Sequence, residues 1–525
     1  MCDSDMKDMD RLLRYLCFGS ESCFKVCSPP VGPVPAFLMN LLGDGKGEEV
    51  VREVTRCHSD KRYVSRTGMF ITLAVCVRTE CQKTKQAALK AAQEICVLPS
   101  DLFGFIHYAM SVAESQKGWG RAMRNMVHTW YNSRNGKELA ALTTRFKTSA
   151  GWSHVDLLRL SHIKATNPGV ELVLKYLAKG MEAARNLVVE DSSSDVKEIL
   201  EYLQAVDTVK HSQDDQQIAR LVEQHRLTKE HIPTPMLKSL EVWTTLVSSL
   251  PLSELLTSFG KLTSIGLLEK DSQAAGTVVS RLSNASEVKT SGINPMSVLV
   301  AQRVYEHNIY KKDKLKHNKA VVESLDAAMA SAISQNMPKT NKKYLIAVKL
   351  GLNHTRAKGT HRGNSVRGTE ALSPSFAAAG VAHILVNVES QCQLVYFVSE
   401  VSQLSLTKEK KIVDICKDIA DASSSMEAVL GRCDLSAPIQ WAERKKLVFD
   451  VFIILTDCKD STSQPAEALR KYRTSLNLPQ TKLVICGLTA SHVHPADSND
   501  SNILDIAGFN SSVCQVIYNF VCGNI

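Results

Sequence analysis

The change of pattern at Pro338 constrains this chain more than any other feature of its sequence. Before it, apolar residues recur at intervals of three and four, the period of an α-helix. One such series is Leu102, Phe105, Ile106, Ala109, Met110 and Ala113. After it, short apolar runs alternate with amphipathic stretches. We therefore predict a helical domain at 1–340 and an α/β domain at 341–525, joined through the polar, basic segment 338–343.

The breaks in the helical part carry residues that start or stop helices. Pro99-Ser100-Asp101 can cap a new helix, and Pro168, Pro233, Pro251 and Pro295 mark further boundaries. A long run of medium-length helices with short connectors predicts an α-solenoid of stacked helix pairs. No exact period is visible, so any repeat is degenerate. Such a stack curves and offers a concave or annular surface to a ligand.

The second part predicts a mostly parallel sheet covered by helices on both faces. The expected strands are 344–348, 393–399, 449–457 and 481–488, and the expected helices include 409–422 and 465–477. In doubly wound folds of this kind the ligand site lies beyond the carboxyl ends of the strands. Lys349 and Asp457 both fall at such ends.

The positive charge of the chain is unevenly distributed. The formal net charge is +9. Residues 344–525 contain 18 Lys and Arg against 17 Asp and Glu, whereas residues 1–343 contain 45 against 37. An excess confined to one region favours a polyanionic partner, either nucleic acid or an anionic membrane surface. The alternative is a solvated surface that happens to be rich in lysine.

Targeting and redox signals are few. We find no apolar run near the roughly 18 residues that span a bilayer, and the first residues lack the pattern of a signal peptide. Fifteen cysteines are scattered, with no CxxC pair. They are typical of reduced, buried thiols, so we expect a cytoplasmic location, with the nucleus as a second compartment.

Residues 117–164 form a basic belt. It contains nine Lys and Arg but only two acids, Glu138 and Asp156. The cations are Lys117, Arg121, Arg124, Arg134, Lys137, Arg145, Lys147, Arg159 and Lys164. Interleaved with them are Trp119, Trp130, Tyr131, Phe146 and Trp152. Cations neutralise phosphates and aromatic faces stack unpaired bases. For the aromatic residues we favour a place in the core; for the cations we favour contact with phosphates.

Several stretches of the chain resemble one family. They are RLLRYLCFGSE (11–21), GWGRAMRNMVHTWYN (118–132), FKTSAGWSHVDLLRLSHIK (146–164), VEQHRL (222–227), VWTTLVSSLPLSELL (242–256) and the terminal LVICGLTA and DIAGF. In this order they resemble the SS-A/Ro ribonucleoprotein family. The resemblance implies a ring of HEAT-like helical repeats, the TROVE module, followed by a von Willebrand factor A-like domain. It also implies a protein without enzymatic activity or cofactor, which binds small noncoding Y RNAs on a basic outer surface and single-stranded ends of misfolded RNAs in the ring hole.

The resemblance also implies which residues contact RNA. The predicted contacts are Arg121, Arg124, Arg145, Lys147, Arg159, His162 and Lys164. Ser149 departs from the family pattern, in which a basic residue tends to precede the Asn-Gly-Trp, so one phosphate contact is expected to be missing. The partners implied are Y RNA and misfolded noncoding RNA, with protein partners at the A-like domain; we expect a monomer that contacts no membrane.

The family's metal site is degenerate in this chain. In the family, the strand that corresponds to 344–348 ends in the pattern Asp-x-Ser-x-Ser. This pattern binds Mg²⁺ through oxygen ligands. The corresponding positions here include Lys349, Gly351 and Asn353, and the downstream Thr is Cys433, a soft ligand. Only the Asp of the Thr-Asp pair, Asp457, remains. We predict no divalent metal, and an ion pair of Lys349 with Asp457 in its place.

Other readings stay open. The chain could be a protein-interaction scaffold that uses the A-like domain and has lost much of its RNA binding. We find no nucleophile–base arrangement and no P-loop, so an enzyme has little support. The basic loop 356–367 could contact RNA, although a solvated loop is the simpler interpretation. His492 and His494 are read as turn residues.

Overall fold

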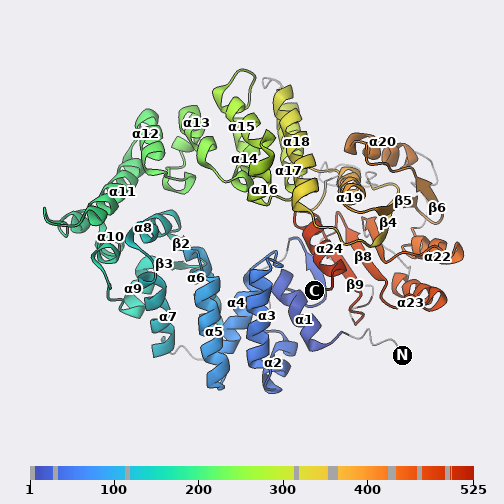
Figure 1. Cartoon of the computed structure of the whole chain (residues 1–525), viewed down its shortest axis with the longest axis horizontal. Helices are drawn as coiled ribbons and strands as arrows, with labels where there is room; N and C mark the ends of the chain where they lie inside the picture. The colour runs from blue at the N-terminus through green and yellow to red at the C-terminus, as the bar shows by residue number, and fades with distance from the viewer. Residues whose placement is uncertain are drawn as a thin grey trace, which may run out of the picture. The chain divides into compact units, whose positions relative to one another are not determined.

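The computed structural model describes most of the chain. The described residues are 6–27, 34–112, 119–311, 318–352, 365–369, 371–423, 433–457, 464–490, 497 and 499–525; of 308–311 only the backbone is described. The chain divides into two compact units (Figure 1). Unit 1 comprises Met1–Val31 with Pro251–Ile525, and unit 2 comprises Gly32–Leu250. The predicted boundary between residues 340 and 341 separates a helical part from an α/β part. The division into these two units does not test that boundary, which stays a prediction.

Unit 2 is helical. Its α-helices are α2 (Ala36–Gly43), α3 (Gly47–Ser59), α4 (Thr67–Arg78), α5 (Gln82–Ile95), α6 (Pro99–Ser111), α7 (Arg121–Asn132), α8 (Gly136–Arg145), α9 (His154–Ser161), α10 (Pro168–Arg185), α11 (Ser194–His211), α12 (Asp215–His225) and α13 (Leu240–Ser249). Two 3₁₀ turns, η1 (Lys229–His231) and η2 (Met236–Lys238), separate α12 from α13, and strands β2 (Thr148–Ser149) and β3 (Trp152–Ser153) form a hairpin.

The helix starts follow the predicted capping chemistry. Helix α6 begins at Pro99, and the Asp101 carboxylate accepts the backbone N–H of Leu98 at 3.2 Å. Helix α10 begins at Pro168, where the Asn167 side chain accepts the N–H of Val170. Proline costs nothing at a first turn because its missing N–H would have no partner there. These two predicted boundaries are confirmed.

Unit 1 contains helices α14 (Leu252–Ser264), α15 (Gln273–Ser283), α16 (Ala285–Ser291), α17 (Pro295–Lys311) and α18 (Lys319–Asn336), followed by an α/β part. The sheet of this part has seven strands among the described residues. In spatial order they are β1 (Cys23–Lys25), β9 (Ile503–Ala507), β8 (Lys482–Gly487), β7 (Val451–Thr456), β4 (Lys343–Lys349), β5 (Gln391–Phe397) and β6 (Val401–Leu404). Neighbouring strands are parallel except for β5 and β6.

Helices cover both faces of this sheet, as the apolar strands predict. Helices α22 (Ala437–Arg444) and α23 (Pro465–Leu476) pack on one face through Trp441 and Tyr472, against Leu345 and Phe452. Helices α19 (Pro374–Val388) and α24 (Val513–Val521) meet the opposite side of β4 at Tyr344. Helix α20 (Ile412–Ser423) packs on α19. The four predicted strands and both predicted helices are confirmed, with small shifts of their ends.

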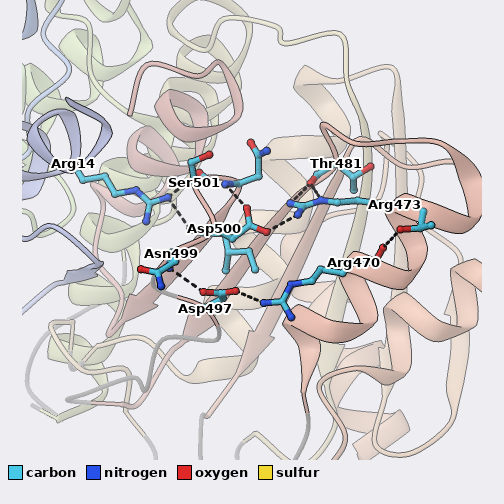
Figure 2. Close-up of polar contacts among 11 residues, drawn as sticks. Arg14, Arg470, Arg473, Thr481, Asp497, Asn499, Asp500 and Ser501 are labelled. Atoms are coloured by element: carbon cyan, nitrogen blue, oxygen red, sulfur yellow. Dashed lines mark hydrogen bonds and ion pairs between the residues drawn. The ribbon is translucent and has the colours of Figure 1, made fainter. Parts of the chain in front are cut away.

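The N-terminal segment joins the α/β part. Helix α1 (Asp8–Phe18) carries Arg14, which is 1% exposed. Its guanidinium donates to the carbonyl of Ser501 at 2.9 Å (Figure 2). It also donates to the carbonyl of Ile503 at 2.8 Å. Strand β1 then adds to the sheet edge at β9, with Cys23 opposite Asp505. The segment is therefore part of the α/β fold of unit 1.

Candidate functional site

Helix α7 has an exposed polar side opposite its buried one. The buried residues are Met123, Met126, Val127, Trp130 and Tyr131. Residues three, four and seven apart share a helix face, so Arg121, Arg124, His128 and Asn132 follow one another along the other side; we call these four residues the α7 stripe. The side chains of Arg121 and Arg124 are exposed and form no hydrogen bond or ion pair with any described residue. Their charge is therefore available to a ligand.

Asn132 extends the α7 stripe onto the segment after α9. Its amide donates to the carbonyls of Lys164 and His128, each at 3.1 Å. Its carbonyl oxygen accepts the backbone N–H and the hydroxyl of Thr166, both at 2.9 Å. The backbone of Lys164 is thereby held at the end of α7. Sequence reasoning missed Asn132, although it closes the quoted WYN of the family-like stretch.

The segment held by Asn132 brings three more predicted contact residues to the surface. Arg159 lies in the last turn of α9, and His162 caps that helix with a left-handed backbone, φ 51°. The side chains of Arg159, His162 and Lys164 are exposed and form no hydrogen bond or ion pair with a described residue. Together with Arg121 and Arg124 they give a surface of side-chain donors that have no partner among the described residues.

A buried histidine fixes α9 and the hairpin to α7. The Tyr131 hydroxyl lies 2.6 Å from His154 Nδ1, and His154 Nε2 lies 2.9 Å from the Phe146 carbonyl. The carbonyl can only accept, so Nε2 carries the hydrogen and Nδ1 accepts from the hydroxyl. Burial lowers the pKa of His154 to about 4, which keeps the ring neutral. Backbone positions of Phe146 and His154 are thus set by a network without charge.

The aromatic residues of the basic belt were predicted to lie in the core, and three of the five are buried there. Trp119, Trp130 and Tyr131 are buried, in agreement with their predicted place in the core. Phe146 and Trp152 are half-buried, and the Trp152 ring lies 6.0 Å from the Trp119 ring. Most of the aromatic surface is therefore used for packing and is closed to unpaired bases.

The remaining cations of the belt differ in their surroundings. Arg145 Nε donates to Glu230 Oε2 at 3.1 Å, and Lys137 pairs with Asp195 and Glu198. The Arg134 guanidinium lies 3.8 Å from the centre of the Trp130 ring. The Lys147 side chain is exposed and has no hydrogen bond or ion pair among the described residues, and Lys117 lies outside them. Of the seven predicted contact residues, Arg145 is the one with a carboxylate partner within the described chain.

The degenerate metal position contains an ion pair. Lys349 ends β4 and Asp457 follows β7, its neighbour in the sheet. Lys349 Nζ donates to Asp457 Oδ1 at 2.5 Å, with side-chain exposures of 15% and 11%. The predicted pairing of these two residues is confirmed. The ammonium occupies one side of the carboxylate and repels a divalent cation there.

The other positions do not supply the missing oxygen ligands. Gly351 has no side chain and donates its N–H to Ser423 Oγ at 3.2 Å. Burial raises the pKa of Cys433 to about 11, so its thiol stays protonated and binds metal poorly. Asn353 lies outside the described residues. In the part of the chain that the structure describes, no group of three His, Cys, Asp or Glu is placed to hold a metal ion. The residues present do not fit Mg²⁺; that no metal binds stays a prediction.

Two other sequence features lie largely or wholly outside the described residues. The basic loop 356–367 is described only from residue 365, where the Arg367 N–H bonds to the Leu488 carbonyl. His492 and His494 lie outside the described residues. Within the described chain, none of the helices combines the length and the apolar character required to cross a membrane.

The fold and the two sites define a class of protein: a helical-repeat module followed by a von Willebrand factor A-like domain whose metal position holds a lysine. Comparison with known proteins agrees with this class. Residues 48–347 match the family model described as TROVE domain, and residues 359–521 match the one described as Ro60 vWA domain. The TROVE match covers more than half of the chain, and the chain belongs to this family.

Relatives extend the match along nearly the whole chain. The "RNA-binding protein RO60" of Caenorhabditis elegans is 29% identical, over 93% of this chain and 83% of the relative. The protein of the same name from Deinococcus radiodurans is 27% identical, over 84% and 78%. The crystal structure of the Deinococcus radiodurans RO (RSR) protein superposes with a TM-score of 0.82 at 23% identity and covers 99% of this chain. That structural match supports the predicted fold class.

Proposed function

We propose that this chain is a non-catalytic RNA-binding protein and that the α7 stripe, together with Arg159, His162 and Lys164, contacts the RNA backbone. The relatives named RNA-binding protein RO60 support the ligand class. The observation that carries the proposal is the α7 stripe itself. Its arginines are exposed and have no carboxylate partner among the described residues, and a hydrogen bond from Asn132 joins the stripe to Lys164.

The dimensions of the α7 stripe suit a row of phosphates. Arg121 and Asn132 are eleven residues apart, which is roughly 16 Å along an α-helix. A nucleic-acid strand in a duplex carries one phosphate per about 3.4 Å of axis, so several phosphates lie within that length. Arginine forms paired, charge-assisted hydrogen bonds to phosphate oxygens. The α7 stripe can therefore position RNA along a rigid helix.

The burial of the aromatic residues favours one kind of RNA. Sequence-tolerant binding of single strands uses exposed aromatic faces for stacking, whereas Trp119, Trp130 and Tyr131 are buried here. Recognition through phosphates suits a structured RNA with paired segments. We therefore propose small structured noncoding RNA of the Y RNA class as the ligand of the α7 stripe. Binding of single-stranded ends of misfolded RNAs, and a role in RNA quality control, belong to the same proposal and rest on family membership.

The double variant Arg121→Ala/Arg124→Ala tests the proposal. Wild-type protein should bind a fluorescein-labelled stem–loop RNA with a dependence on salt, measured by fluorescence anisotropy. The variant should bind about a hundredfold more weakly, and the slope of log Kd against log salt should fall by about 2, because two phosphate contacts are lost.

The matched control is Arg52→Ala/Arg220→Ala. It removes two exposed arginines of the same unit, from α3 and α12, whose side chains form no hydrogen bond or ion pair among the described residues. It should bind nearly as the wild type does. Equal losses in the two double variants would assign binding to net charge alone and would overturn the α7 stripe as the site.

A further inference from the structure

A polar cleft of about 650 Å³ lies between α22 and α23, in the α/β part of unit 1. The two helices pack side by side (Figure 1). Residues three or four apart share a helix face, and the two walls follow this spacing. The α22 side contributes Ser436, Gln440 and Arg444, and the α23 side contributes Gln464, Glu467 and Lys471. The RNA surface proposed above includes none of these residues.

Both helices start at the same end of the cleft. The Asp434 N–H bonds to the carbonyl of Val398, directly after β5, so α22 starts beside the carboxyl ends of the parallel strands. On α23, the Tyr472 hydroxyl donates to the Leu447 carbonyl and accepts the Phe449 N–H, each at 2.8 Å, just before β7 begins. The later parts of both helices therefore lie toward the amino ends of the strands. The cleft begins at the edge where doubly wound folds bind their ligands.

Ser436 is the residue that points to a ligand. It lines the cleft, directly precedes α22 and is 3% exposed. A serine in this position usually accepts an N–H of its own helix, but the Ser436 hydroxyl makes no such bond. It forms no hydrogen bond with any other described residue either. A buried hydroxyl without a partner costs free energy, and a donor or acceptor of a ligand in the cleft would remove that cost.

The start of the cleft is rich in acceptors. One oxygen of the Asp434 carboxylate accepts the Ser436 N–H at 2.8 Å, and the other has no partner among the described residues. The Gln464 amide donates to Glu467, and because the amide is neutral it leaves the charge of that carboxylate uncompensated. Two carboxylates near a free hydroxyl suit a cation with several donors, such as a guanidinium or an ammonium group.

The far end of the cleft has the opposite charge. Arg444 and Lys471 lie there and are exposed, and Glu443 is the one carboxylate beside them. The side chains of these three residues form no hydrogen bond or ion pair within the described chain. The two cations can therefore bind an acidic group without giving up a partner in the protein.

We propose that this cleft binds an extended peptide segment of a partner protein, which carries a basic residue and, about three or four positions away, an acidic one. The basic side chain contacts Asp434, Glu467 and the Ser436 hydroxyl. The acidic side chain contacts Arg444 and Lys471. The eight residues from Ser436 to Arg444 correspond to roughly 12 Å along a helix, which three or four residues of an extended chain can span.

The charges of the cleft argue against RNA as its ligand. Its three carboxylates outnumber its two cations, so the phosphates of a nucleic acid are repelled. The inference does not rest on the proposed function, because it concerns other residues and another class of partner.

A peptide array tests the predicted spacing. Each spot carries a peptide of glycine and serine with one arginine and one glutamate, in both orders and at every spacing from adjacent to far apart. The probe is the fluorescently labelled full-length chain. It should be retained best where the two charges are about three or four positions apart. Peptides with two arginines or two glutamates at that spacing should bind about tenfold more weakly, measured by fluorescence anisotropy.

Two variants separate binding from folding. Ser436→Ala should weaken binding of the best peptide about fivefold and leave the melting temperature unchanged, because the hydroxyl has no partner within the described chain. The double variant Arg444→Glu/Lys471→Glu reverses the far end, so it should prefer the peptide with two arginines. Such a change of preference requires a folded cleft.

The matched control is Lys411→Glu/Lys417→Glu. It makes the same change in net charge at two exposed lysines of the same unit, whose side chains form no hydrogen bond or ion pair with a described residue. It should keep the preference of the wild type for one arginine and one glutamate.

Several results would overturn this inference. They are a wild type that retains none of the peptides, retention that is independent of spacing, wild-type affinity in Ser436→Ala, and an unchanged preference in Arg444→Glu/Lys471→Glu. Weaker binding of the stem–loop RNA in this double variant, but not in its control, would assign the cleft to RNA and overturn the peptide as its ligand. The α7 stripe is tested separately, through RNA binding by the arginine variants of unit 2.

Discussion

The cations of the α7 stripe and the cation that ends β4 have the same charge and opposite surroundings. Arg121 and Arg124 are exposed and without a carboxylate partner in the described chain. Lys349 is mostly buried and donates to Asp457 at 2.5 Å. An unpaired exposed cation can bind a ligand and contributes little to stability. A buried cation stabilises the fold, because without it the carboxylate that it pairs with would be buried uncompensated. The comparison teaches that pairing, more than the number of cations, separates a ligand-binding surface from a structural element.

The largest expected effect concerns the buried member of this comparison. Lys349→Ala leaves the Asp457 carboxylate buried without its cation, and should lower the free energy of unfolding by about 3 kcal/mol. Arg121→Ala should change it by less than about 0.5 kcal/mol. Urea titrations followed by circular dichroism measure both.

The paired replacement Lys349→Met/Asp457→Leu is the control for this prediction. It removes both charges together and should recover most of the lost stability. Magnesium added to the wild type should leave the unfolding midpoint in place, since the carboxylate already has a cation. A midpoint that rises with magnesium would show that the folded protein binds the ion, and would falsify the replacement of the metal by the Lys349 ammonium.

The next effect concerns the histidine that holds the α7 stripe in position. The pKa of His154 is lowered from 6.5 to about 4 by burial. The unfolded chain therefore binds a proton at this position before the folded protein does. The neutral His154 ring therefore contributes a stability that is complete above about pH 6.5 and is lost as pH falls toward 4, because protons then favour the unfolded chain. It should cost roughly 2 kcal/mol between about pH 7 and pH 5, measured as the shift of urea midpoints with pH.

His154→Gln should reduce that dependence on pH. A glutamine amide can donate to the Phe146 carbonyl and accept from the Tyr131 hydroxyl, while it takes up no proton in this range. Some dependence should remain, because burial lowers the pKa of His231 as well. The control is His162→Gln, which removes an exposed imidazole. An identical dependence on pH in the wild type and His154→Gln would show that the buried ring is not the group that titrates.

Local patterns were sufficient to predict most of the fold. The apolar run at 344–348 lies in β4, buried from Tyr344 to Val348, and Pro99 with Asp101 begins α6 as its capping chemistry requires. Strand β1 could not be found in this way. It is three residues long, and its place at the sheet edge depends on β9 and on the contacts of Arg14 with Ser501 and Ile503, nearly five hundred residues away.

The candidate site was predictable in composition but not in pairing. The spacing of Arg121 and Arg124 places them on one helix face, and both are exposed. Nothing near Arg145 in the sequence shows that Glu230, 85 residues later, accepts from its guanidinium. Lys349 and Asp457 were paired correctly because the resemblance to the family places both positions in one metal site, and the structure places them at the ends of neighbouring parallel strands. The helical part lacks such a rule, since its repeat is degenerate.

Arg145 is the intermediate case, and it gives the smallest expected effect. Its side chain and that of Glu230 are 25% and 27% exposed, so the pair is reached by solvent and stabilises the fold by less than about 1 kcal/mol. Glu230→Gln removes the negative charge beside the guanidinium and should tighten binding of the stem–loop RNA about threefold, with little change in stability. Glu223→Gln, an exposed carboxylate on α12, makes the same change in net charge and serves as the control. If both variants tighten binding equally, the gain comes from the overall field, and Arg145 belongs with Lys349 as a structural cation. If only Glu230→Gln does, Arg145 belongs with the α7 stripe, because a cation joins the binding surface once its carboxylate is removed.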